Sequence, residues 1–422
     1  MVSDLDTIKN ILMDSDTFIK LNQSKQFKRI ISLDKNIAVV DGDEWKRHKK
    51  VVNPAFKRGW DIKIFIKVGI KAINYMKKNG NDFELIKLLK NSTLDSLGLS
   101  IFDVDFNSIE DENCEISTLY VNFIKGINNI WFLLFPFLDN LPIPSRIQLK
   151  KDTDRFCQLL KDLINGKREQ IKKYGVDNVK SSLLTMLIQS SDDNNSISDG
   201  LTDEEIISDV IVFFIAGHDT TAHTLSSILY YLSKDQDIQN KLRDEIIHVL
   251  GERSKNINED IQITQEDLNK MKYLEAVINE GMRILPVASI ITRQVAKDYY
   301  FNNEIQFKKG QPLLLNLALA MNNETKFKHP EEFNPNRFLI QNEKEEIQID
   351  KKLTKDMIGF SVGPRMCIGN QFSLLEQKVF LILILLKFNV ELPQDSIHCK
   401  HPILPALGIS SPKDLKLNFI PI

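Results

Sequence analysis

The stretch FSVGPRMCIG at residues 360–369 decides how the rest of the chain is interpreted. It places Cys367 on a short loop, with a glycine on each side, an arginine two residues before it and a phenylalanine seven residues before it. Residues 370–386 are predicted to form a helix that ends in an apolar run. A thiol close to a cation and to a helix N-terminus is biased toward the thiolate, which is the form that binds metals. The loop therefore predicts a metal-binding cysteine, and a buried structural cysteine is the ordinary alternative.

The remaining residues of the loop suit a flat ligand. Gly363 and Gly369 permit backbone geometry that turns amide N–H groups toward the sulfur and lets such a ligand approach. Every fixed position of the pattern F-x-x-G-x-R-x-C-x-G is filled, so the loop resembles the haem-ligand loop of the cytochrome P-450 superfamily. The resemblance implies that Cys367 is the axial thiolate ligand of haem b iron, that Phe360 packs on the haem and that Arg365 holds a propionate.

Composition bounds the remaining possibilities. The chain has 422 residues, 42% of them hydrophobic and 27% charged, with a net charge of -2, so nothing points to nucleic acid. The four cysteines show no CxxC spacing, which argues against a disulfide framework or a zinc site built on cysteines. No stretch approaches the roughly 18 apolar residues of a membrane span. The first six residues are acidic and polar, unlike a signal peptide, so we expect a soluble intracellular chain.

A long helix is predicted over residues 203–234, after a capping box formed by Thr202 and Glu205. Its centre, AGHDTT at residues 216–221, puts a glycine and polar side chains where apolar residues are expected, and such conflicts concentrate at functional sites. The run resembles the oxygen-binding motif of the same superfamily. In that case Asp219 and Thr220 deliver the protons for dioxygen reduction, with local opening of the helix at Thr220. A kinked helix with polar residues facing solvent is the alternative.

Basic residues elsewhere fit haem propionates. Trp45 and Lys49 lie four residues apart on a predicted helix and present an indole N–H and an ammonium in one direction. A solvated basic helix explains them equally well until the resemblance is considered, since the superfamily places a Trp and a basic residue on a propionate here. Most members have Arg where Lys49 stands, and a lysine makes a less directional contact. The resemblance assigns Arg293 the same role.

A structural cluster is implied by a second set of motifs. Glu280 and Arg283 lie three residues apart on a helix predicted over residues 269–285, which alone is a common arrangement. The segment FNPNRF at residues 333–338 resembles the superfamily segment whose arginine, here Arg337, completes a buried Glu-Arg-Arg cluster. We expect this cluster to brace the cysteine loop.

The substrate pocket is implied only by resemblance. Ala216, Ile290 and Ile291 are expected to line it, and Leu407 is expected at the turn of a final hairpin formed by residues 402–409 and 415–421.

One further segment could border that pocket. The apolar residues 130–138 resemble a loop that lies beside the substrate channel and often touches the bilayer. An ordinary core segment explains them equally well.

We expect a mainly α fold with small mixed β-sheets, as one cytochrome P-450 domain over residues 1–422. Residues 3–13 show a helical period, with Ser3 and Asp6 placed as a capping pair. Only 44 residues precede Trp45, so the usual N-terminal anchor, first helix and first sheet strands are expected to be absent.

The implied function is a haem-thiolate monooxygenase that inserts one atom of O2 into a mostly apolar substrate. The sequence has no flavin or dinucleotide motif, so electrons are expected from a separate NADPH-dependent cytochrome P-450 reductase. A non-catalytic or unstable truncated remnant is one alternative. A haem-thiolate isomerase or dehydratase is another, although such relatives tend to lose the pair that Asp219 and Thr220 represent. As written the chain is expected in the cytoplasm, and a full-length form on the cytoplasmic face of the endoplasmic reticulum.

Overall fold

The computed structural model describes residues 1–21, 35–111, 113–127, 129, 131–132, 135, 137–138, 141–179, 182–192, 200–258, 260–301, 305–342, 346–405 and 408–422. The described chain forms two compact units. The cysteine unit, which holds Cys367, comprises Met1–Phe18, Trp60–Thr93 and Asp219–Ile422. The second unit comprises Ile19–Gly59 and Leu94–His218. The single domain expected over residues 1–422 stays a prediction.

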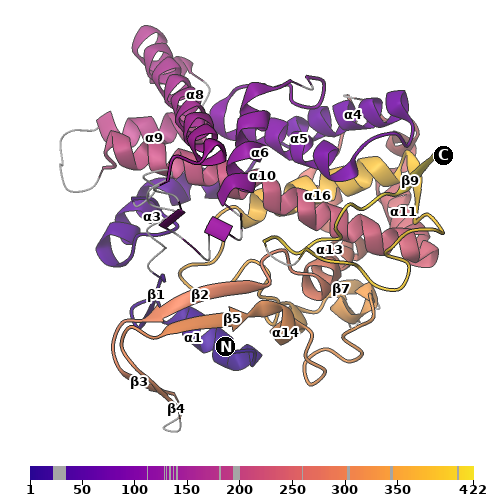
Figure 1. Cartoon of the computed structure of the whole chain (residues 1–422). Helices are drawn as coiled ribbons and strands as arrows, with labels where there is room; N and C mark the ends of the chain where they lie inside the picture. Colours follow the sequence, from indigo (N-terminus) through magenta and orange to yellow (C-terminus); the bar gives the residue numbers. More distant parts are fainter. Residues whose placement is uncertain are drawn as a thin grey trace. The chain divides into compact units, whose positions relative to one another are not determined.

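Helices dominate both units, which confirms the mainly α prediction (Figure 1). The helices confined to the cysteine unit are α1 (Leu5–Met13), α4 (Ile62–Asn79), α11 (Gln236–Leu250), α12 (Gln265–Lys270), α13 (Lys272–Ile284), α14 (Leu317–Met321), α15 (Lys351–Thr354) and α16 (Asn370–Leu385). Those of the second unit are α3 (Gly42–Lys57), α6 (Glu115–Ile127), α8 (Pro144–Tyr174) and α9 (Leu183–Asp192). Two more, α5 (Leu85–Leu97) and α10 (Asp203–Lys234), run from one unit into the other.

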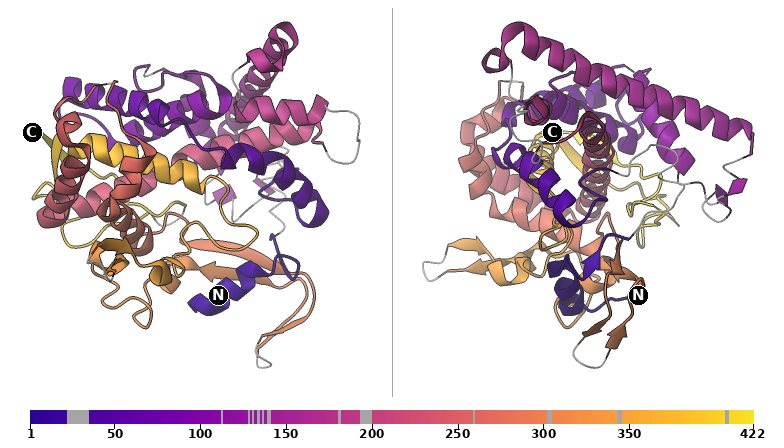
Figure 2. Two further views of the ribbon diagram at one scale, coloured as in Figure 1. Left: turned by 180° about the vertical axis from the view of Figure 1, so that it is seen from behind. Right: turned by 90° about the vertical axis from the view of Figure 1, so that its left-hand side faces the viewer.

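The β-strands form small sheets. A three-stranded sheet has the order β1 (Phe18–Ile19), β2 (Ile290–Val295), β5 (Pro312–Asn316), and two-stranded ladders join β3 (Tyr299–Phe301) to β4 (Ile305–Phe307), β6 (Leu339–Gln341) to β7 (Ile347–Ile349) and β8 (Phe388–Glu391) to β9 (Asn418–Pro421). The pairs β2–β5, β3–β4, β6–β7 and β8–β9 are antiparallel. The β3–β4 hairpin extends from the far ends of β2 and β5 as a long arm (Figures 1 and 2).

Two local predictions were wrong. The N-cap of α1 is Asp4, whose carboxylate accepts the Thr7 N–H, so Ser3 and Asp6 do not form the cap. The C-terminal strand β9 pairs with β8, which follows α16, instead of forming a hairpin with residues 402–409. Leu407 lies outside the described residues.

The core of the cysteine unit explains why α1 and α16 form. The apolar face of α1, centred on Ile8 and Ile11, is buried against Leu313 and Leu315 of β5. Helix α16 is buried almost all round and packs against α4, as expected for a helix that is apolar on every side. The helix carrying the residues after Cys367 is therefore anchored in the unit's interior.

The second unit is centred on aromatic side chains. Phe214 of α10 packs its ring 5.1 Å from that of Phe156, 5.7 Å from Tyr120 and 6.2 Å from Phe102, measured between centroids. These rings come from four different helical segments, so they fix the N-terminal half of α10 within the unit.

Within the described ranges, no helix combines the length and apolar character that crossing a membrane demands. The predicted 130–138 segment is described only in part, and there Trp131, Phe135 and Phe137 are exposed. Phe132 is buried under the Arg146 guanidinium, 3.9 Å from its ring centroid. Three of the four described aromatics of this segment therefore face outward.

Candidate functional site

The cysteine loop is closed by its own backbone. The Cys367 N–H donates to the Phe360 carbonyl at 2.9 Å, and the Met366 N–H donates to the Gly363 carbonyl at 3.2 Å. Helix α16 begins immediately after the loop, with Gly369 as its N-cap. The Cys367 side chain is exposed, and the Gly369 N–H points at its sulfur. The thiol is thus held in a fixed place and remains accessible to a ligand.

The two glycines of the loop serve different purposes. Gly363 has φ +77°, and a Cβ there would lie 2.5 Å from the Leu12 carbonyl oxygen at the end of α1. Only glycine satisfies both conditions. Gly369 has φ -86°, which any residue adopts, so its contribution is the amide aimed at the sulfur.

Two opposing effects act on the charge of the Cys367 thiol, and the thiolate predicted from the sequence stays a prediction. Desolvation by the surrounding protein raises the pKa of Cys367, and the single amide hydrogen bond from Gly369 offsets this only in part. A coordinating metal ion removes the thiol proton outright, so a raised pKa of the free thiol is compatible with a metal-bound thiolate. An accessible sulfur with one amide donor suits an axial thiolate ligand of haem.

The residues at the centre of α10 have different surroundings. His218 is buried, donates from Nδ1 to the Phe214 carbonyl at 3.0 Å and packs its ring 4.2 Å from that of Tyr120, so it is a core residue of the second unit. Ala216 and Thr220, one turn apart, are exposed on one face of the helix. The expected opening at Thr220 is not present, because α10 continues as an α-helix from Asp203 to Lys234.

Gly217 allows a close approach to the helix backbone, as predicted, but the group that approaches is a side chain of α5. A Cβ on Gly217 would lie 2.6 Å from a methyl carbon of Leu97 at the end of α5. This glycine therefore sets how closely α5 packs on α10 in the second unit.

Asp219 is buried in the cysteine unit and faces a lysine that the sequence analysis missed. The Lys90 ammonium of α5 lies 2.8 Å from Asp219 Oδ1. The Lys90 side chain is 27% exposed and the Asp219 side chain 5%, so the pair joins a buried carboxylate to the surface. Lys90 precedes Asp219 by 129 residues, counted along the sequence, and no local pattern distinguishes it from other surface lysines.

A buried chain of hydrogen bonds links α10 to α16. The Thr221 hydroxyl lies 2.9 Å from the Ser373 hydroxyl, and the Gln377 amide donates to Ser373 Oγ at 2.9 Å. Ser373 and Gln377 lie one turn apart on α16, the helix that follows Cys367. The helix that presents Thr220 and the helix that follows the cysteine are therefore joined by polar contacts.

The predicted propionate ligands lie in both units. In the second unit, the Lys49 ammonium lies 4.7 Å from the Trp45 ring centroid, so the two share one face of α3 as expected. In the cysteine unit, Arg293 of β2 is buried and donates to the Thr292 carbonyl at 2.8 Å, and Arg365 is half-buried in the loop. A buried guanidinium such as that of Arg293 suits an anionic ligand group.

The two isoleucines of β2 differ in surroundings. Ile290 is 48% exposed, whereas Ile291 packs against the core between α1 and the sheet. Adjacent strand residues point to opposite faces, so Ile290 alone presents its side chain outward.

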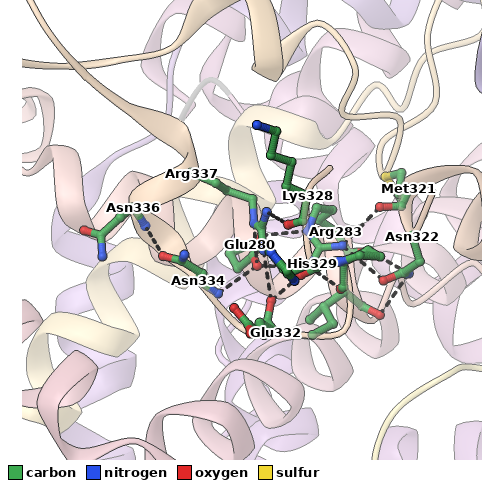
Figure 3. A network of polar contacts seen from close by, with 12 residues as sticks. Glu280, Arg283, Met321, Asn322, Lys328, His329, Glu332, Asn334, Asn336 and Arg337 are labelled. Atoms are coloured by element: carbon green, nitrogen blue, oxygen red, sulfur yellow. Dashed lines mark hydrogen bonds and ion pairs between the residues drawn. The ribbon is translucent and has the colours of Figure 1, made fainter. Parts of the chain in front are cut away.

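The structure brings Glu280, Arg283 and Arg337 together (Figure 3). Arg283 Nε lies 2.7 Å from Glu280 Oε2, and Arg337 Nε lies 2.9 Å from Glu280 Oε1. The Asn334 N–H also donates to Oε1, at 2.8 Å. The remaining guanidinium donors bind the last carbonyl of α14, the side chain of the residue after it, and backbone carbonyls of the segment from there to Arg337, which includes Lys328. This satisfaction of every charged group is what makes a buried carboxylate tolerable.

Asn334 explains how the 333–338 segment reaches the cluster. Its side chain accepts the Asn336 N–H and caps the short 3-10 turn Pro335–Phe338, which delivers Arg337.

Comparison with known proteins identifies the family. The family model "Cytochrome P450" matches residues 1–419. The chain belongs to the cytochrome P450 family. This P450 is 28% identical over 415 residues to cytochrome P450 6B1 of Papilio polyxenes, covering 93% of the chain and 78% of the relative. It is 29% identical to human cytochrome P450 4F11 (83% and 67% covered) and 28% identical to mouse cytochrome P450 3A11 (92% and 76% covered).

As a P450, the chain is a haem-dependent monooxygenase, and its own residues fit that cofactor. The accessible Cys367 sulfur with its amide donor, the buried Arg293 and the exposed face of α10 are what an axial ligand, a propionate partner and an oxygen-side helix require. A redox partner and an organic substrate follow from the family.

Proposed function

We propose that this P450 hydroxylates a mostly apolar organic substrate with electrons from a separate NADPH-dependent reductase. The reaction consumes the substrate R–H, O2, two electrons and two protons, and yields R–OH and water. The single supporting observation is the accessible Cys367 sulfur on a loop that matches every fixed position of the haem-ligand motif. When bound, haem b supplies the dioxygen binding and O–O cleavage that a thiolate ligand favours.

The cofactor's position would be set by two kinds of contact. Cys367 would ligate the iron from the loop, and Phe360 would pack against the haem. The cations Arg365, Arg293 and Lys49, together with the indole N–H of Trp45, would hold the propionates through charge-assisted hydrogen bonds. The buried location of Arg293 supports its part in this set, because a buried guanidinium is stabilised by an anionic partner.

Asp219 and Thr220 would deliver the two protons that the reaction consumes. Thr220 is exposed on the same face as Ala216, where a hydroxyl can donate a hydrogen bond to a bound ligand. Asp219 is held by Lys90, whose part-exposed ammonium exchanges protons with solvent. The carboxylate would receive protons from that side and pass them to the Thr220 face as a general acid, directly or through water.

The substrate would contact Ala216 and Ile290, which are exposed apolar residues on α10 and β2. Ile291 packs on the core and would shape this region from behind. Leu407 keeps the pocket role implied by the family, outside the described residues.

The exposed Trp131, Phe135 and Phe137 support contact with the cytoplasmic surface of the endoplasmic reticulum. Flotation of the purified chain with phosphatidylcholine vesicles tests this. Serine at Trp131 and Phe137 should abolish co-flotation, and undiminished co-flotation would contradict it.

The deciding experiment is the carbon monoxide difference spectrum of the reduced chain, run beside two cysteine variants. Cys367→Ser should abolish the red-shifted Soret band of a thiolate ligand. Cys399→Ser, which changes another exposed thiol of the same unit, should leave it intact. The same loss in both variants, or no band in the parent chain, would refute the assignment of Cys367. Turnover with NADPH and a purified reductase then tests the electron source.

A further inference from the structure

We propose that a divalent transition-metal ion of the zinc type binds Glu44, His48 and Glu205 in the second unit. The carboxylates of Glu44 and Glu205 and a ring nitrogen of His48 offer three ligand atoms that all lie within 4.8 Å of one another. Glu44 and His48 lie one turn apart on α3, and Glu205 lies in the first turn of α10. The ion would tie these two helices together.

The main evidence for the site is a buried ring nitrogen of His48 that makes no hydrogen bond within the described part of the chain. His48 is fully buried, and its Nδ1 lies 2.7 Å from Asp209 Oδ2. Asp209 is held in turn by the Ile37 N–H, which donates to Oδ1 at 2.7 Å. A carboxylate at Nδ1 keeps the proton on that nitrogen and leaves Nε2 with a free lone pair, as on histidines that bind metals. Among the described residues, Nε2 has no hydrogen-bond partner.

The distance across the cluster fits a bridging ion better than a hydrogen bond. His48 Nε2 lies 3.6 Å from Glu205 Oε1, beyond the usual range of about 2.7–3.2 Å for a hydrogen bond. Two ligand atoms about 2.1 Å from a tetrahedral zinc ion are separated by roughly 3.4 Å. The two groups are therefore spaced as they would be on one metal ion.

Glu205 has a coordination direction left for that ion. Its Oε2 accepts from Arg47 and from the N–H and hydroxyl of Thr202, whereas Oε1 accepts only from Arg47 among the described residues. A carboxylate oxygen has two lone pairs, so Oε1 can bind a cation on its second one. The exposed Glu44 would close the site on its solvent side, with water as a fourth ligand.

The net negative charge around His48 also favours a bound divalent cation. Three carboxylates, those of Glu44, Glu205 and Asp209, surround His48, and the cation Arg47 is bonded to Glu205. With a neutral imidazole the local sum is -2, which one divalent ion neutralises. An imidazole ligand favours zinc over magnesium or calcium, which prefer oxygen ligands alone.

Equilibrium dialysis of the haem-loaded chain against Zn2+, without a polyhistidine tag, tests the proposal. Zinc, iron and protein are quantified together, so that zinc bound per folded chain is known. We expect one equivalent in the parent chain and at least about tenfold weaker binding in Glu44→Gln and in His48→Gln. Glu44→Gln is decisive if His48→Gln fails to fold, because Glu44 is exposed.

Two control variants locate the ion. Glu204→Gln removes the neighbouring exposed carboxylate that pairs with Lys35, and His329→Gln removes an exposed histidine beside Glu331 and Glu332. Both should bind zinc like the parent. Absence of binding in the parent, binding unaffected by Glu44→Gln, or loss in His329→Gln would overturn the proposal.

X-ray absorption at the cobalt edge of the Co2+-loaded chain gives a readout that haem does not obscure. One imidazole among oxygen ligands at about 2.1 Å is expected, and a shell without imidazole would contradict the site.

Discussion

Replacing Lys90 with methionine tests the ion pair at the centre of α10. The 2.8 Å separation from Asp219 Oδ1 corresponds to a Coulomb attraction of about 6 kcal/mol at an effective dielectric constant of roughly 20. Desolvation of both groups cancels much of this. The 27% exposure of Lys90 places the pair between exposed pairs, worth about 0.2–1 kcal/mol, and buried ones, whose disruption costs about 3–5 kcal/mol. We expect Lys90→Met to lower the free energy of unfolding by about 2 kcal/mol.

A double-mutant cycle isolates the interaction. Urea unfolding of the parent, Lys90→Met, Asp219→Asn and the double variant gives the coupling energy. Lys87→Met, an exposed lysine one turn earlier on α5, is the matched control and should change stability by less than about 0.5 kcal/mol. A coupling energy below about 0.5 kcal/mol would refute the reasoning.

The same variant bears on the proposed proton supply. Because Lys90 would fix Asp219 and connect it to solvent, Lys90→Met should lower product formed per NADPH consumed and raise hydrogen peroxide, with the haem spectrum unchanged. Unchanged coupling of NADPH to product in a folded Lys90→Met variant would remove the lysine from proton delivery.

Further predictions concern buried charge and close packing. Glu280→Gln weakens ion pairs to two buried guanidinium groups and should destabilise the chain by about 3–5 kcal/mol, seen as a lower urea midpoint; a loss under 1 kcal/mol would contradict it. The hydrogen bond from Arg253 lowers the pKa of Asp267, so the ionised carboxylate stabilises the fold at pH values above its unfolded pKa near 3.8, and this stabilisation is lost as the pH falls. Asp267→Asn should therefore lower the free energy of unfolding by about 1 kcal/mol at pH 7, and this loss should shrink between pH 5 and 3. Gly363→Ala should cost more than about 2 kcal/mol and weaken haem retention, whereas Gly166→Ala, in an open helical position, should stabilise by about 0.5–1 kcal/mol; equal effects of the two alanines in urea unfolding would be inconsistent with the close contact at Gly363.

Local signals in the sequence predicted the elements that present the site. The capping box places the start of α10, since Thr202 N–H donates to Glu205 and the Glu205 N–H returns a bond to Thr202, and the helix ends at Lys234 as expected. The start of α16 at Asn370 follows in the same way from the loop that precedes it. These features depend on residues a few positions apart, which a sequence displays directly.

Long-range partners could not be predicted. Nothing near Asp219 indicates that Lys90 faces it, and nothing near His48 indicates Asp209, because each pair forms only when distant helices pack. The surroundings of the thiol are hidden from the sequence for a related reason. A cation and a helix N-terminus are visible in sequence, whereas the desolvation that raises the pKa of Cys367 comes from atoms folded around it.

The hydrogen-bond chain between α10 and α16 constrains how this enzyme can vary. Ser373→Ala alone would leave the Thr221 hydroxyl and the Gln377 amide buried with one partner fewer, at a cost of about 1–3 kcal/mol. Replacing all three by apolar residues of similar shape can be nearly neutral. In a mutational scan or a directed-evolution library, these three positions should therefore change together, because each single substitution on its own lowers the stability of the fold.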